Sequence, residues 1–191
     1  ATELGDVPVM FTKVPPQMLA TAQGNVGKNF PWGGDFSAAK TVSVHLGRPN
    51  GNDGIFQTGH ANCPSVTFPD GSTNILVQGD ITHPVSFFVH PSFASIHTQE
   101  YFVRATVRRV SAGNVGMNLL YEVADSQGRG AYANVGQWFG VKAEQEGWQT
   151  HTWHVKNACF AKMWGNDITI RPEQSVPFVI GKVEVSVEGF K

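Results

Sequence analysis

The sequence has no surplus of charge of either sign. Lys and Arg together number 14 against 15 Asp and Glu, which gives a formal net charge of −1. Proteins that bind a nucleic-acid backbone carry an excess of positive charge to neutralise the phosphates, so the balance disfavours a nucleic-acid partner. No apolar run approaches the roughly 20 residues that cross a bilayer, and no membrane partner is expected.

Cysteine is also scarce, with Cys63 and Cys159 the only two in 191 residues. Neither cysteine lies in a CxxC pair or at a Cys/His spacing that binds metal. The two thiols either form one disulfide across a long loop, worth about 2–4 kcal/mol, or stay buried and free. Both alternatives remain open, because the sequence does not place the two Cα atoms within bonding range.

Helical periodicity is rare, whereas alternation of apolar and polar residues recurs. The alternation is clearest over 41–46, 101–107 and 178–187, and it is typical of strands with one buried face. Less regular candidate strands cover 74–78, 85–89, 118–123, 132–135, 149–155 and 167–171. Glycine is frequent, at 21 residues, and turn sequences such as Pro-Asp-Gly at 69–71 separate the strands. The pattern predicts an all-β fold, with two antiparallel sheets packed face to face in a β-sandwich.

The first 40 residues differ from the rest, because prolines and glycines interrupt them repeatedly. We expect a single domain, with 1–40 as an extended leading segment packed on a sandwich core formed by 41–191. No signal peptide is visible at Ala1. The chain therefore either begins after a removed leader or is a module of a longer protein.

Several short segments carry a family resemblance. In chain order they are Leu46-Gly47, Asn52-Asp53-Gly54-Ile55, Asp70-Gly71, Phe87-Phe88-Val89, Ser92-Phe93, Tyr101–Arg108, Leu120-Tyr121, Trp148–Trp153, Asn157-Ala158 with Phe160, Asp167–Ile170 and Lys182–Val185. This series resembles the jelly-roll modules of carbohydrate-binding type that accompany catalytic domains in bacterial polysaccharide-degrading proteins. Departures are His90, where an acidic residue is expected, and Thr169, where Arg is common.

The resemblance implies a jelly-roll β-sandwich that is secreted, that binds a polysaccharide or oligosaccharide without cutting it, and that is linked to a catalytic domain. It also implies a structural Ca²⁺ held by carboxylate and backbone oxygens. The candidate ligands are Glu3, Asp6, Asp35 and Asp167. None of these carboxylates lies at a diagnostic spacing, so turn capping is the alternative role for each.

Sugars bind to exposed aromatic rings and to planar polar side chains beside them. Three loops offer this combination, and we expect them at one end of the sandwich. The candidate sugar-binding residues are Trp32, Arg129, Tyr132, Trp138, Trp164 and Asn166. By contrast, Trp153 lies within a strand and is expected in the core, and Trp148 is expected to act as a lid on that core.

Two other functions remain as alternatives. A small jelly-roll lyase or glycoside hydrolase would need a pair of carboxylates, for which Glu100, Glu122 and Asp125 are available. No GxSxG or HExxH motif is present, and His151 and His154 point to opposite faces of a strand. A structural spacer domain would bury the candidate rings under its own residues.

Overall fold

The structure is a computed structural model that describes residues 34–48, 51–58, 65–73, 77–94, 99–124, 130–134, 137–162 and 166–190, with only the backbone described for 130–134. This part of the chain forms strands and no helix. The strands are β1 (Thr41–His45), β2 (Asn52–Asp53), β3 (Ile55–Thr58), β4 (Val77–Gly79), β5 (Val85–Val89), β6 (Gln99–Arg109), β7 (Val115–Ala124), β8 (Gly130–Asn134), β9 (Phe139–Val141), β10 (Gln149–Ala158), β11 (Ile168–Pro172) and β12 (Phe178–Ser186). Within the described ranges, no helix could span a membrane.

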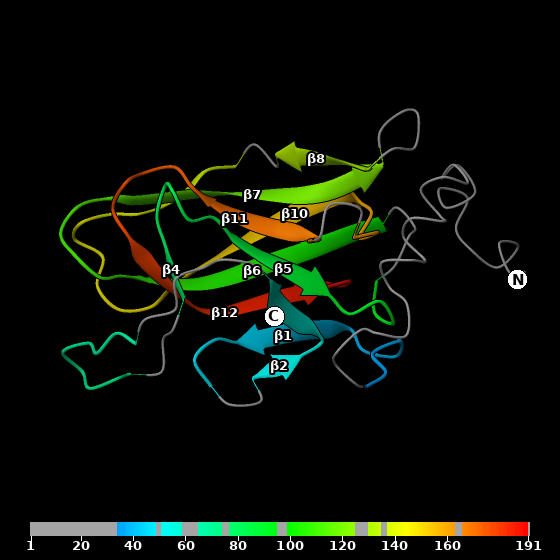
Figure 1. The fold of residues 1–191 in the computed structure, drawn as a ribbon, viewed down its shortest axis with the longest axis horizontal. Helices are drawn as coiled ribbons and strands as arrows, with labels where there is room; N and C mark the ends of the chain where they lie inside the picture. Colours follow the sequence, from blue (N-terminus) through cyan, green and yellow to red (C-terminus); the bar gives the residue numbers. More distant parts are fainter. Residues whose placement is uncertain are drawn as a thin grey trace, which may run out of the picture.

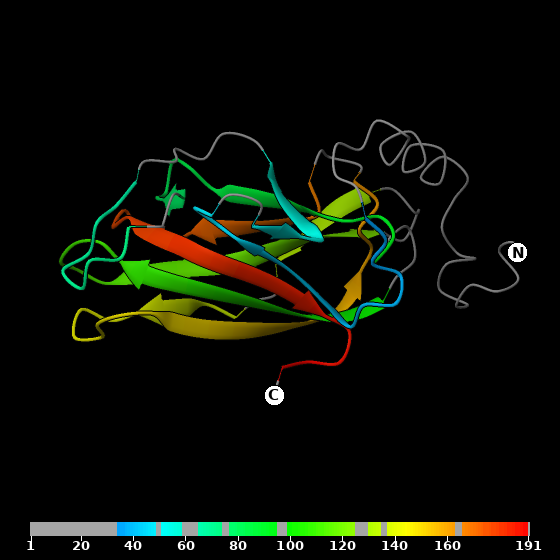
Figure 2. The same cartoon turned by 90° about the horizontal axis from the view of Figure 1, so that it is seen from below.

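The strands form two antiparallel sheets (Figure 1). One sheet has the order β10-β6-β12-β1-β2, with β4 beside β12, and is called the β6 sheet here. The other has the order β3-β5-β11-β7-β8, with β9 beside β7, and is called the β7 sheet. Figure 2 shows the two sheets as two stacked layers. The predicted β-sandwich is therefore confirmed.

The core lies between the two sheets and is built by the alternation seen in the sequence. In β6, Tyr101, Val103, Ala105 and Val107 are fully buried, whereas the residues between them lie on the outer face. Trp153 of β10 is also fully buried, as predicted. Removing a large side chain of this kind from water contributes about 1.5–3 kcal/mol, and the shared inward face fixes the register of each strand.

A β-bulge interrupts the pairing of β12 with β6 between Ile180 and Lys182. Ile180 and Val183 are both fully buried, although three positions separate them and a regular strand would put them on opposite faces. The extra residue is Gly181. It shifts the alternation by one position and turns Lys182 to the outer face of the β6 sheet.

Candidate functional site

The indole ring of Trp138 lies across two glycines on the outer face of the β7 sheet. Gly116 of β7 and Gly140 of β9 are register partners, and a Cβ atom on either would overlap the ring. The ring is nevertheless 52% exposed. The two glycines therefore let the indole settle on the sheet backbone, while the rest of its surface stays open to solvent.

The residues on both sides of Trp138 are anchored. Trp153 donates its Nε1–H to the carbonyl oxygen of Gln137 at 2.9 Å. The ring of Phe139 stacks on His151 of β10, with 4.7 Å between centroids and 10° between planes. This stack joins the edges of the two sheets. The backbone that carries Trp138 is thus fixed before any ligand arrives.

The outer face of the β7 sheet also carries planar polar side chains. Arg171 of β11 points outward, because its neighbours Ile170 and Pro172 are buried on the inner face. Its Nε and Nη2 donate to Oε1 of Glu173 at 3.2 and 2.8 Å. The backbone N–H of Glu173 donates to the carbonyl of Gly116 at 2.8 Å, directly under Trp138. A guanidinium and a carboxylate are therefore carried by the chain that pairs with β7 next to Gly116.

The outer face of the β7 sheet continues from this point toward the end of β7. From Gly116 to Leu120, the last position on this face before the buried Glu122, the strand advances by four residues, about 13 Å. Further side chains on this face are Asn118, Leu120, Thr169, Ser86, Phe88 and Phe56. Ser86 and Thr169 share a hydrogen bond of 2.8 Å between their hydroxyls. None of these side chains is among the predicted sugar-binding residues, although their alternation with buried neighbours in the sequence could have placed them on one face.

The two other predicted sugar-binding residues that lie in described segments, Tyr132 and Asn166, are not gathered around Trp138. Tyr132 is the register partner of Glu122, near the end of β7, whereas Trp138 lies over Gly116 near its start. Asn166, just before β11, accepts a long hydrogen bond of 3.4 Å from the hydroxyl of Thr169. Three of the predicted residues lie outside the described residues: Trp32, Arg129 and Trp164.

The expectation that Trp148 covers the core is wrong. Its side chain is 36% exposed and lies on the outer face of the β6 sheet, where its ring meets Phe68 edge to face at 6.1 Å. The reason is its position directly before β10, which begins at Gln149. Five positions separate Trp148 from Trp153, so the alternation along the strand turns the two rings to opposite faces of the β6 sheet.

Of the four predicted calcium ligands, Asp35 and Asp167 are described, and they play different roles. Asp35 is exposed, and its Oδ1 accepts the backbone N–H of Ser37 at 2.9 Å in a turn cap; hydrogen bonds from the side chain of Ser37 and then from this backbone N–H lower the pKa of Asp35. Asp167 is fully buried. Glu3 and Asp6 lie outside the described residues. Within the described ranges, no group of three or more His, Cys, Asp or Glu side chains is placed to hold a metal ion.

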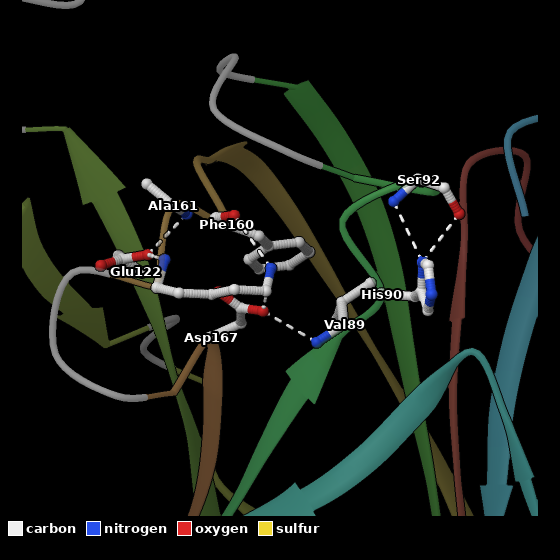
Figure 3. Close-up of polar contacts among 8 residues, drawn as sticks. Val89, His90, Ser92, Glu122, Phe160, Ala161 and Asp167 are labelled. Carbon is white, nitrogen blue, oxygen red and sulfur yellow. Dashed lines mark hydrogen bonds and ion pairs between the residues drawn. The ribbon is translucent and has the colours of Figure 1, made fainter. Parts of the chain in front are cut away.

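Asp167 is instead paired with a lysine. Its Oδ2 contacts Nζ of Lys162 at 2.9 Å and accepts the backbone N–H of Val89 at 2.8 Å (Figure 3). Both side chains of the ion pair are completely buried. Burial raises the pKa of Asp167, and the neighbouring Lys162 ammonium opposes that rise. The Asp167 carboxylate is therefore already paired with a cation, the ammonium group of Lys162.

Glu122 holds the loop that contains Lys162. Its Oε1 accepts the backbone N–H groups of Ala161 and Lys162, both at 2.7 Å, and the contact to Ala161 is visible in Figure 3. Lys162 has a φ of 60°, in the left-handed region, and its Nζ also donates to the carbonyl of Phe160 at 3.3 Å. Glu122 is thus a buried structural group.

The two candidate catalytic carboxylates that the structure describes, Glu100 and Glu122, do not form a pair. Glu122 belongs to the β7 sheet, whereas Glu100 belongs to the β6 sheet and contacts Nε2 of His154 at 3.0 Å. Asp125 lies outside the described residues. Cys159 is a buried, free thiol whose pKa is raised by burial to about 12, and Cys63 also lies outside the described residues.

Comparison with known proteins places the fold. No protein-family model and no curated protein matches the sequence. The CBM22-1 xylan-binding domain from Paenibacillus barcinonensis Xyn10C is similar in structure, with a TM-score of 0.52 at 10% identity over 78% of this chain and 95% of that domain. The Clostridium thermocellum Xyn10B CBM22-1-GH10 modules, complexed with xylohexaose, give a TM-score of 0.47 at 12% identity over 78% of this chain and 27% of that one. The xylan-binding module CBM15 gives 0.44 at 10% identity, over 79% and 98%. The chain therefore shares its β-sandwich fold with the domain that gives a TM-score of 0.52.

Proposed function

We propose that this chain is a non-catalytic carbohydrate-binding module that holds a polysaccharide along the outer face of the β7 sheet. The observation that carries the proposal is the ring of Trp138, which is supported from below by Gly116 and Gly140 and is 52% exposed. The similar domain with a TM-score of 0.52 is a xylan-binding domain, which supports the same function for this fold.

The geometry suits a sugar for two reasons. The flat, apolar surface of an indole packs against the C–H face of a pyranose ring. The guanidinium of Arg171 donates hydrogen bonds to sugar hydroxyls, and the carboxylate of Glu173 accepts them. Because Gln137 and Phe139 fix the backbone on both sides of Trp138, the ring loses little freedom on binding.

In a longer secreted protein, such a module serves a linked catalytic domain. It keeps the enzyme on an insoluble or dilute substrate. Once the module has bound the polysaccharide, binding of the linked catalytic domain to the same polysaccharide becomes intramolecular. The gain is in effective concentration and requires no catalytic group in this chain. The substrate class expected from the extended face of about 13 Å is a linear polysaccharide, bound along its interior.

Affinity gel electrophoresis with soluble xylan and hydroxyethylcellulose tests the proposal. The wild-type chain should be retarded, and Trp138→Ala should weaken binding by about 10- to 100-fold, as expected for an aromatic anchor. Phe190→Ala is the matched control, since Phe190 packs on Arg104 of the β6 sheet, on the other layer, with 4.1 Å from ring centroid to guanidinium. Absence of retardation in every polysaccharide, or equal loss in both variants, would overturn the proposal.

A further inference from the structure

A hollow lies on the outer face of the β6 sheet, on the layer opposite Trp138, and the proposed function does not use it. Its volume is about 220 Å³, and its lining includes His45, Arg48, Thr106, Trp148, Gly181 and Lys182. Three of these side chains carry or can carry positive charge, and no carboxylate is among the residues that line it. An exposed ring and several cationic donors therefore face the same space.

The ring of Trp148 is seated by the bulge in β12. Gly181 has no side chain, and a Cβ atom there would lie 2.9 Å from Cη2 and Cζ3 of the indole. Phe68 supports the ring edge to face, and the guanidinium of Arg108 lies 6.0 Å from its centroid. Contacts within the fold thus fix the position of Trp148, although the residue is 36% exposed.

The positive charge of the hollow is only partly neutralised. Lys182, which the bulge turns outward, contacts Glu184 at 3.2 Å, but that carboxylate also binds Arg104 through two hydrogen bonds. Among the residues that the structure describes, Arg48 has no carboxylate partner. The pKa of His45 is lowered by burial and then by Lys182 and Arg48, and only partly restored by Glu184 and Asp53. The site therefore favours an anion.

We infer that this hollow binds an acidic sugar residue, a uronate, with its ring on Trp148 and its carboxylate on Arg48 and Lys182. The hydroxyl of Thr106, the register partner of Lys182, lies on the same face and is available to a sugar hydroxyl. A planar guanidinium and an ammonium are the groups that bind carboxylates most strongly in proteins. That the anion belongs to a sugar rests on the proposed function, whereas the anion preference rests on the hollow itself.

Calorimetric titration with trigalacturonate and with its trimethyl ester tests the inference, because the ester keeps the same sugar chain but replaces each carboxylate with a neutral methyl ester. The wild-type chain should bind the acid at least about tenfold more tightly than the ester, as expected for charged hydrogen bonds. Lys182→Met, Arg48→Gln and Trp148→Ala should each weaken binding of the acid by about tenfold. Lys156→Met removes the same charge from an exposed site farther along β10 and should leave the affinity unchanged.

Histidine titration by NMR provides a second readout that does not depend on the variants folding equally well. Saturation with trigalacturonate should raise the pKa of His45, because a nearby carboxylate favours the imidazolium form. Equal binding of acid and ester, an equal effect of Lys156→Met and Lys182→Met, or an unchanged His45 pKa would overturn the inference. Failure of the proposed function is seen separately, since xylan retardation depends on Trp138 and not on this hollow.

Discussion

The buried ring of Trp153 holds the carbonyl oxygen of Gln137 at 2.9 Å, one residue before the exposed ring of Trp138. A core residue thus fixes the backbone of the proposed binding platform. Trp153→Phe keeps an aromatic ring but removes the donor and leaves a small gap, so we expect a loss of about 1–3 kcal/mol in the free energy of unfolding. Urea denaturation measures this loss, and xylan binding should weaken with it; unchanged binding would show that the bond does not position Trp138.

Gly116→Ala tests the seat of Trp138 directly. The added methyl group overlaps the indole ring, so we expect the ring to leave the sheet and xylan binding to weaken. The stability lost in Gly116→Ala should largely disappear in a Trp138→Ala background, since the clash then has no partner. A double-mutant cycle by urea denaturation measures this coupling, and simple additivity of the two losses would contradict the proposed seat.

Glu184 makes the stability of the β6 sheet depend on pH. Burial works to raise its pKa, but hydrogen bonds from Arg104 and Lys182 outweigh burial and hold the pKa below its ordinary value of 4.5. Because the folded pKa is lowered, the contribution is complete above pH 4.5 and is lost as the pH falls through the folded pKa. Glu184→Gln should cost about 1–3 kcal/mol at pH 7 and progressively less below pH 4.5, measured by urea denaturation at each pH.

Lys162→Met should be strongly destabilising, because it leaves the Asp167 carboxylate buried without its cation. We expect a loss of about 3–5 kcal/mol at pH 7, most of which Asp167→Asn should restore in the double variant. In Lys162→Met the raised pKa of Asp167 makes the loss small below pH 3.8, the ordinary value, and larger as the pH rises through the folded pKa. A loss that is independent of pH would contradict this assignment.

The sandwich could be predicted from the sequence because its signals are local. Alternation over 101–107 and 178–187 marks the inward faces of β6 and β12, and turn residues mark the ends of strands. Trp153 belongs to such a pattern, so its burial followed from its position. Trp148 lies just outside the pattern, and its seat depends on a bulge at Gly181 that period-two alternation cannot show.

The candidate site was only partly predictable for a related reason. Trp138 stands out as an aromatic residue in a polar, Gly-containing segment, and its exposure agrees with that interpretation. Its seat requires Gly116 and Gly140 to be register partners, which is a contact between distant segments. Lys162 and Asp167 resemble ordinary polar loop residues, and their burial follows from the way the loop folds back onto Glu122.

The buried ammonium group of Lys162 can also be used to measure local opening of this fold. Amine-acylating reagents react with exposed lysines such as Lys156, but Lys162 is completely buried and shielded by its carboxylate. The reagent reaches it only when this end of the sandwich opens. The rate of acylation at Lys162, followed by peptide mass spectrometry, would therefore measure local opening in the native state.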